Sequence, residues 1–153
     1  MSVLNTARVQ FDAFKDDAFF MTAVNQNMST SIQARGVILA TGRFQGGGLY
    51  AKRGLIQETV FNLPVYQPGQ RNKWYDLDFF NPAGHAVNQA GVETNKNYQP
   101  LDINHRPKYE HLSAAGTILA HNDWARLKAG SGVALVSAIT TVNHFYKATE
   151  ARK

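Results

Sequence analysis

Cysteine is absent from the 153 residues of the chain. This absence excludes disulfide bonds, cysteine-ligated zinc and thiol catalysis. The sequence also contains no uncharged apolar run of about 18 residues, so we expect no membrane-spanning helix. Its first residues, MSVLNTARVQFDAF, lack a cationic start followed by an unbroken apolar stretch, and we therefore expect no secretory signal.

Common catalytic and nucleotide-binding motifs are missing as well. The sequence has no G-x-S-x-G for a serine nucleophile, and no Walker or G-x-G-x-x-G pattern for a nucleotide phosphate. The histidines at positions 85, 105, 111, 121 and 144 include no i,i+4 pair around a glutamate, so we predict no metal site. His121, two residues before Asp123, is the histidine that we consider as a proton donor or acceptor.

The charge of the chain is positive but dispersed. The formal net charge is +5. Lysine and arginine occur in scattered pairs, which are Lys52/Arg53, Arg71/Lys73, Arg106/Lys108 and Arg126/Lys128. This distribution favours anionic ligands only weakly. Because acids are interleaved with the cations and no recognisable motif accompanies them, we expect no nucleic-acid partner.

The first 42 residues have the pattern of strands. A hydrophobic content of 44% is sufficient for the core of one domain. Residues 7–12 and 18–24 are rich in aromatic and β-branched side chains around a polar break at 15–17, which predicts a β-hairpin. After a polar turn at 25–30, the apolar run 36–41 ends at Gly42. This run predicts a strand that is buried on both faces.

The middle of the chain, residues 43–110, predicts loops with short strands rather than long helices. It contains all five prolines and the run Gly46–Gly48. So long a segment with little regular structure is unusual in a free-standing domain, so we expect it to cover a ligand, another part of the protein or a partner. Its aromatic cluster KWYDLDFF, residues 73–80, is typical of a core or an interface.

The last part of the chain predicts a strand, a loop and a helix. Residues 111–120 form an apolar strand candidate, and apolar residues at every third or fourth position predict a helix from Gly130 to about Thr149. The free amides at the helix start, Gly130, Ser131 and Gly132, can bind an electron-rich oxygen, and Asp123 can accept hydrogen bonds from sugar-like hydroxyls. The simpler alternative is that Asp123 or Ser131 caps the helix.

Two sequence blocks together resemble a known family. ARGVILATGRFQGGGL and HLSAAGTILAHNDWARLKAGSGVALVSAI are similar to the C-terminal half of the flavoproteins with two dinucleotide-binding domains. With GLIQETVFNLPV and WYDLDFFNPAGH between them, the pattern resembles the B subunits of the anaerobic glycerol-3-phosphate dehydrogenases. The four blocks fall at 40–49, 54–65, 74–85 and 130–132, and the resemblance covers most of residues 35–147.

The resemblance implies a role for several residues. Ala40, Thr41 and Gly42 would lie against a flavin cofactor, FAD or FMN. Asp123 would bind the ribityl hydroxyls. The amides of Gly130, Ser131 and Gly132 would face the pyrimidine edge of the ring, and Arg126 or Lys128 could add positive charge there. The resemblance assigns no catalytic residue.

The resemblance also implies an incomplete fold. We expect a mixed α/β, partial FAD/NAD(P)-binding-type fold with an N-terminal hairpin or meander, a buried parallel strand, a loop-rich middle, a closing strand and a C-terminal helix. Residues 1–153 would form one partial domain, in which 1–42 and 110–153 belong to the flavin domain and 43–109 form a cap. The family's N-terminal G-x-G-x-x-G half would be absent, so the chain alone would bind flavin poorly and be inactive.

Partners and location follow from the same resemblance. The implied activity is oxidation of glycerol 3-phosphate to dihydroxyacetone phosphate, with electrons passed to quinone. Implied partners are the missing N-terminal half, a catalytic flavoprotein subunit and an iron–sulfur subunit, which would place the protein in the cytoplasm at the inner membrane. A fumarate-reductase-like flavoprotein and a non-enzymatic interaction domain remain as alternatives.

Overall fold

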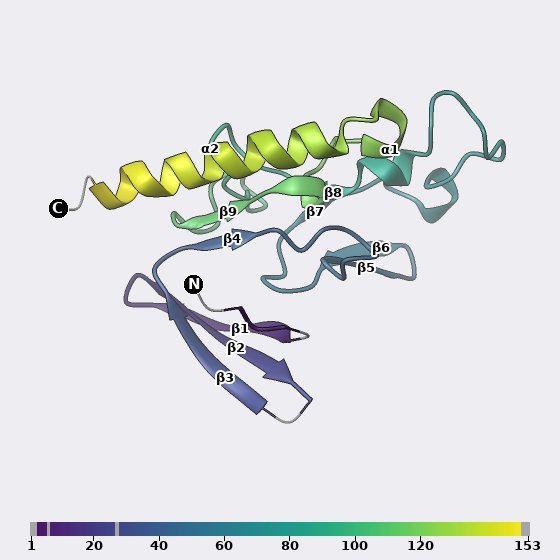
Figure 1. Cartoon of the computed structure of the whole chain (residues 1–153). Coiled ribbons are helices and arrows are strands. Elements are labelled where there is room, and N and C mark those ends of the chain that lie inside the picture. Colours follow the sequence, from purple (N-terminus) through teal and green to yellow (C-terminus); the bar gives the residue numbers. More distant parts are fainter. Residues whose placement is uncertain (1–2, 6, 27, 151–153) are drawn as a thin grey trace. The chain divides into compact units, whose positions relative to one another are not determined.

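A computed structural model describes residues 3–5, 7–26 and 28–150 of the chain (Figure 1). The chain divides into two compact units, Met1–Val37 and Ile38–Lys153. Each unit is described by itself below.

The first unit is a three-stranded antiparallel sheet. Its strands are β1 (Arg8–Lys15), β2 (Ala18–Asn25) and β3 (Met28–Ala34), in the order β1-β2-β3. Asp16 and Asp17 join β1 to β2 with φ angles of 51° and 57°. Two left-handed residues match the twist of a tight hairpin, and aspartate tolerates this conformation. The predicted hairpin is therefore confirmed, and the third strand begins within the segment 25–30, for which the sequence predicts a polar turn.

The sheet has one apolar face, which the central strand supplies. Phe19, Met21 and Ala23 alternate along β2 and are buried. The ring of Phe19 lies 4.8 Å from that of Phe14 and 6.5 Å from that of Phe11, both on β1. These aromatic contacts hold the hairpin together.

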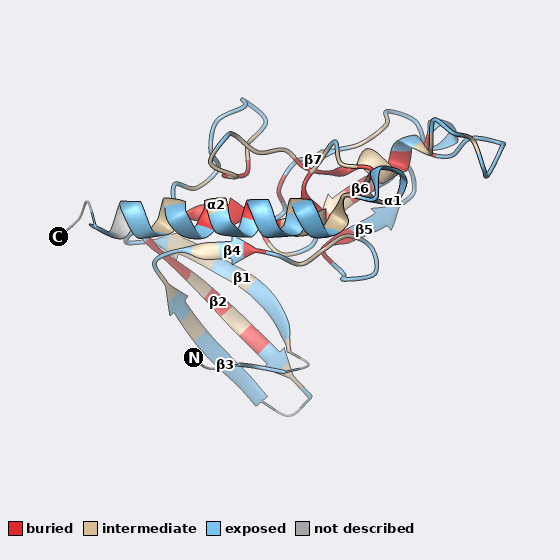
Figure 2. Ribbon diagram, turned by 45° about the horizontal axis from the view of Figure 1, so that its top comes forward, coloured by how far each residue is buried: buried red, intermediate tan, exposed pale blue. Residues whose placement is uncertain are grey.

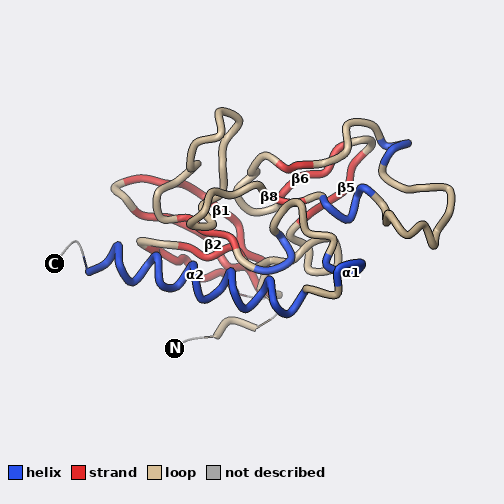
Figure 3. The backbone as a smooth tube through the Cα atoms, turned by 90° about the horizontal axis from the view of Figure 1, so that it is seen from above, coloured by secondary structure: helices blue, strands red, loops and turns tan. Residues whose placement is uncertain are grey.

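The second unit is made of short strands, 3-10 turns and helices (Figure 3). Three two-stranded sheets pair β4 (Val37–Leu39) with β9 (Leu112–Ala114), β5 (Leu49–Lys52) with β6 (Leu55–Glu58), and β7 (Val65–Tyr66) with β8 (Gly91–Val92). The 3-10 turns are η1 (Arg71–Lys73), η2 (Ala86–Gln89) and η3 (Gly116–Ile118). The helices are α1 (Trp124–Leu127) and α2 (Gly130–Glu150). Loops with short strands in the middle of the chain and a helix from Gly130 confirm the sequence prediction.

Two predicted strands differ from the structure. The run 36–41 forms only the three residues of β4, and Ile38 remains 40% exposed while Leu39 is buried. The prediction of burial on both faces is therefore wrong, because Ile38 lies on the face opposite Leu39 and that face is not fully covered. The candidate strand 111–120 is also shorter, because Gly116, with φ 78°, turns the chain into η3.

Helix α2 packs on the unit through small polar side chains. Ser137 and Thr141 are fully buried, and the Ser137 hydroxyl accepts a hydrogen bond from the Gly116 amide at 2.9 Å. Apolar residues whose spacing predicts the helix lie elsewhere: Val136, Ile139, Val142 and Tyr146 are each more than half exposed, and most of the helix is pale blue in Figure 2. Their spacing places them on one side of the helix, away from Ser137 and Thr141. Within the described residues, no helix is both long enough and apolar enough to cross a membrane.

The first unit provides a test of its core. Replacing Phe19 with alanine removes a fully buried ring, so we expect the free energy of unfolding to fall by about 3–5 kcal/mol. Denaturant unfolding followed by circular dichroism measures this change. Val24→Ala on the exposed side of the same strand is the matched control and should change stability by less than about 0.5 kcal/mol. Equal effects of the two substitutions would contradict the described packing of β2.

Candidate functional site

A tightly folded loop follows β4. It begins with Ala40, Thr41 and Gly42, and Gly42 has a φ of 70° that favours glycine. The Gly48 amide donates to the carbonyl of Arg43 at 3.0 Å, which brings the loop back on itself. A side chain at Gly46 would collide with the carbonyl of Thr41. Glycine at position 46 is therefore a steric requirement of this loop.

A cleft of about 390 Å³ opens beside the loop. Its walls come from the loop after β4, from η2 and from η3. The lining residues are Gly42, Arg43, Phe44, Gln45, Gly46, Val87, Asn88 and Thr117. The hydroxyl oxygen of Thr41, directly before this lining, is buried and has no hydrogen-bond partner among the described residues. The cleft thus has glycine residues, whose backbone a ligand can approach closely, and it has polar groups beside them.

Arg43 holds the walls of the cleft together. Its guanidinium donates to four carbonyl oxygens, those of Thr117 at 2.7 Å, Leu119 at 3.1 Å, Asn122 at 2.8 Å and, by a short contact, Asn88. Burial lowers the pKa of Arg43 from its ordinary value, and the nearby Asp123 carboxylate raises it. Arginine stays charged in proteins, so a positive charge is fixed at the wall of the cleft.

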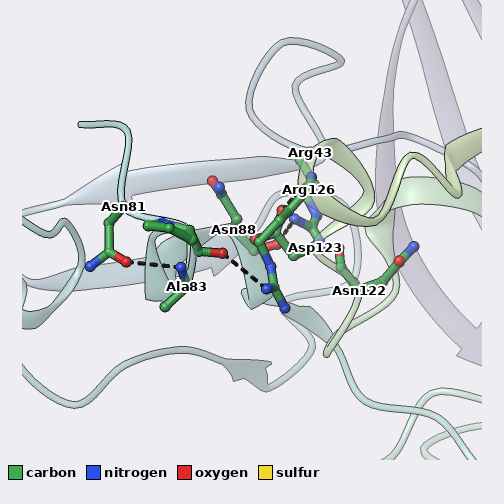
Figure 4. Close-up of polar contacts among 8 residues, drawn as sticks. Arg43, Asn81, Ala83, Asn88, Asn122, Asp123 and Arg126 are labelled. Carbon is green, nitrogen blue, oxygen red and sulfur yellow. Dashed lines mark hydrogen bonds and ion pairs between the residues drawn. The ribbon is translucent and has the colours of Figure 1, made fainter. Parts of the chain in front are cut away.

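Asp123 lies behind this wall and is only 3% exposed. Its carboxylate accepts a hydrogen bond from the Arg126 amide at 3.2 Å, so it caps α1, a helix that the sequence did not predict. The Arg126 side chain returns to the same carboxylate, with 3.9 Å between Nε and Oδ2. Figure 4 shows Asp123 in one cluster with Arg43 and Arg126. The capping role considered for Asp123 exists, but for α1 instead of α2.

The segment 81–84 covers Asp123. Gly84 has a φ of 75°, and a Cβ atom there would lie 2.7 Å from Oδ2 of Asp123. Arg126 donates from Nη1 to the carbonyl of Pro82 at 3.1 Å, and the Ala83 amide donates to the Asn81 side chain at 2.8 Å (Figure 4). These contacts connect the aromatic middle segment of the chain to α1.

The predicted site residues occupy different positions around this centre. Gly42 lines the cleft, and Ala40 and Thr41 precede it directly in the chain. Asp123 is connected to the cleft through the charge of Arg43. Gly130, Ser131 and Gly132 begin α2 after α1, and Ser131 and Gly132 are exposed. Amides in the first turn of a helix have no intrahelical acceptor.

His121 belongs to a separate polar pair. Its Nε2 lies 2.9 Å from Oε1 of Glu93, and its ring centroid lies 4.0 Å from that of Tyr66. The backbone of His121 has a left-handed φ of 62° and its amide donates to the carbonyl of Gln89 at 2.9 Å. The side chains of His121 and Glu93 are both partly exposed. Among the described residues, no group of three side chains is placed to hold a metal ion.

Arg43 is the residue that sequence reasoning missed. The available signal was its position directly after Ala40–Thr41–Gly42, at the end of a strand. Its partners are main-chain carbonyls 45 to 79 positions away in the sequence. Carbonyl oxygens occur at every residue and leave no sequence pattern. Only the tertiary fold therefore identifies the clamp, by which we mean Arg43 and the four carbonyl oxygens to which it donates.

The clamp makes a testable contribution to stability. Arg43→Met removes the donors of four partly buried carbonyls, and we expect a loss of about 2–4 kcal/mol in the free energy of unfolding. Arg43→Lys keeps the charge but not the planar arrangement of donors, so we expect it to lower the free energy of unfolding by less than Arg43→Met does. Thermal and denaturant unfolding measure both. The exposed Arg53→Met is the control, and a clamp variant as stable as this control would contradict the role of Arg43.

Comparison with known proteins identifies a family and several relatives of the chain. The family described as FAD binding domain matches residues 12–133. The B subunit of the anaerobic glycerol-3-phosphate dehydrogenase of Aliivibrio fischeri (strain MJ11) is 35% identical over 106 residues, which are 69% of this chain and 23% of that protein. The corresponding protein of Vibrio cholerae (strain N16961) is 31% identical over 124 residues, 80% of this chain and 28% of its own length.

An archaeal relative extends the similarity. The probable B subunit of the same dehydrogenase from Halobacterium salinarum (strain R1) is 32% identical over 100 residues, 65% of this chain and 23% of its own. The chain therefore spans about a quarter of the length of the curated relatives it matches. No solved structure matches the chain significantly. Because the family match extends over most of its residues, the chain belongs to the FAD binding domain family.

Proposed function

We propose that the chain forms part of the FAD site of a flavin-dependent oxidoreductase that converts glycerol 3-phosphate to dihydroxyacetone phosphate. The observation that carries the proposal is the cleft at the end of β4, within the residues that match the FAD binding domain family. The names of the relatives supply the substrate. The electrons would pass from this enzyme to quinone.

The residues at the cleft fit a part of FAD. Ligand pockets commonly measure about 300–1,000 Å³, so the cleft can hold one portion of the dinucleotide rather than all of it. The unpartnered Thr41 hydroxyl could bond a polar edge of that portion. We propose that residues outside this chain bind the phosphates, because no G-x-G-x-x-G pattern is present in it.

Each predicted site residue has a proposed part in binding. Gly42, with Ala40 and Thr41, would lie against the cofactor. Gly130, Ser131 and Gly132 would offer amides to the edge of its ring. Asp123 is the proposed ligand of the ribityl hydroxyls, and the segment 81–84 that covers it must move aside for that contact.

Bound FAD would supply the hydride acceptor of the reaction, and this chain would supply charge and position. Arg43 places a fixed positive charge at the wall of the cleft. Such a charge in a partly buried site stabilises negative charge that develops on a reduced ring. The loop with Gly42 and Gly46 would hold the ring close to the backbone and exclude water from that side.

We further propose that the protein works in an assembly. The relatives are named as B subunits, which supports companion subunits for this protein. By the resemblance these are a catalytic flavoprotein subunit and an iron–sulfur subunit. Association with them would place the protein at the cytoplasmic side of the inner membrane without a span of its own.

Cofactor binding can be tested on the chain as it stands. Titration with FAD up to millimolar concentration should shift the amide NMR signals of Gly42, Gly46 and Thr117, because these residues line the cleft. Gly46→Ala should remove the shifts, since its Cβ atom would collide with the Thr41 carbonyl. Gly69→Ala, in open space, is the matched control. Shifts located elsewhere, or unchanged by Gly46→Ala, would count against this site.

Substrate use requires the complete dehydrogenase that contains this chain. Anaerobic addition of glycerol 3-phosphate should bleach the visible absorbance of the bound flavin, because hydride transfer reduces the ring. Arg43→Met should lower the reduction potential of the flavin, because it removes the positive charge beside the cleft. A flavin that is bleached by a dicarboxylate but not by glycerol 3-phosphate would overturn the substrate assignment.

A further inference from the structure

The segment 75–80, here called the aromatic tip, exposes large apolar side chains. Tyr75 is 66% exposed, Leu77 107%, Phe79 77% and Phe80 85%. In Figure 2 the segment that contains the tip is pale blue along most of its length. Directly before the tip, Trp74 is only 4% exposed and donates from its indole to the carbonyl of Pro68 at 3.2 Å. The tip is thus anchored at one end, and a concentration of exposed apolar groups is typical of an interaction site.

Side-chain hydrogen bonds fix the backbone of the tip. Asp76 accepts from the Asp78 amide at 2.9 Å, and Asp78 accepts from the Phe80 amide at 3.0 Å. Asn81 continues the series by accepting from the Ala83 amide at 2.8 Å. Each bond closes a local turn around the residue between its partners. The apolar side chains are therefore carried on a backbone with a defined shape.

His85 closes the base of the tip. Its Nδ1 accepts a hydrogen bond from the Asp76 amide at 3.1 Å, so the proton of the neutral ring is on Nε2. That nitrogen lies 3.2 Å from the carbonyl of Phe79 and can donate to it. The ring also lies 5.6 Å from Tyr75 and 5.9 Å from Phe79 between centroids. Because the tip is ordered in advance, a partner that binds it loses little conformational entropy.

The charge of the tip indicates the kind of partner. Asp76 and Asp78 are exposed and alternate with Tyr75, Leu77 and Phe79. Two carboxylates among the apolar side chains would be costly in a lipid layer and would be repelled by anionic headgroups. A protein surface with an apolar pocket and a rim of lysine or arginine satisfies both features.

We propose that the aromatic tip docks into such a pocket on a companion subunit of the dehydrogenase. This inference rests on the proposed multi-subunit function. Leu77, Phe79 and Phe80 fill the pocket, and Asp76 and Asp78 pair with its cationic rim. His85 is a positioning residue, because it acts through the shape of the tip.

Site-specific photo-crosslinking tests the surface in cells that express all subunits of the dehydrogenase. A benzophenone amino acid at Phe80 should form an adduct with a companion subunit, identified by mass spectrometry. The same probe at Tyr50, 57% exposed on β5, is the control position. An adduct with lipid, with a second copy of this chain or with another part of the same protein would overturn the proposal, as would equal yields at both positions.

Three variants separate the contributions to docking. Leu77→Ser with Phe79→Ser and Phe80→Ser should reduce co-purification of the companion subunit by at least about tenfold. His85→Phe should also weaken it, although all the apolar side chains of the tip remain. Leu55→Ser, an exposed change on β6, should have no effect.

A double substitution tests the negative charge of the aromatic tip while preserving its backbone hydrogen bonds. Asp76→Asn and Asp78→Asn together keep the side-chain oxygens that accept the backbone hydrogen bonds but remove both charges. Docking should weaken and lose its salt dependence. Stronger sedimentation with anionic vesicles and undiminished co-purification would instead identify a membrane contact. Flavin content is measured in the same samples, so a failure of docking with full flavin is distinguished from a failure of the proposed cofactor site.

Discussion

The second unit depends on the positive charge of Arg43 and the four carbonyl oxygens that it holds. These carbonyls come from η2, from η3 and from Leu119 and Asn122 in the stretch between η3 and α1. Buried carbonyls need donors, and few regular strand ladders are present here to supply them. One planar guanidinium with several donors replaces those ladders. The shape of the cleft therefore depends on a single side chain and on the Asp123 carboxylate that moderates its charge.

Close backbone approach is the second constraint on the site. Gly46 and Gly84 lie where a side chain would collide, the first with the Thr41 carbonyl and the second with the Asp123 carboxylate. The first contact shapes the cleft, and the second brings the aromatic middle segment against α1. The loop-rich middle of the chain is therefore connected to α1 through Asp123 and Arg126, which both lie against the segment 81–84.

Large apolar side chains lie on the surface of the second unit at two places, α2 and the aromatic tip. Helix α2 uses Ser137 and Thr141 to pack closely, since small side chains allow a short distance between the helix and η3. Its larger apolar residues then face outward, as do those of the aromatic tip. Large apolar groups on rigid elements are characteristic of proteins that bind other surfaces.

Local chemistry in the sequence determined much of the secondary structure. The aspartate turn with its aromatic flanks predicted the hairpin, proline and glycine predicted the short elements of residues 43–110, and apolar spacing predicted α2. The Ala-Thr-Gly turn and the blocks that follow it were also sufficient to identify the FAD-binding family. All of these signals depend on neighbouring residues in the chain, which is why they can be read from it directly.

Tertiary structure decided what surrounds those elements. The apolar run before Gly42 became a three-residue strand with Ile38 exposed, because the burial of a strand face depends on which other segments pack against it. Asp123 became the cap of α1 and the counter-charge of Arg43, because segments that are far apart in the sequence meet there. The sequence alone determined which residue types could bind a flavin. Only the fold decided that main-chain carbonyls, which no residue pattern records, fix the arginine at the wall of the cleft.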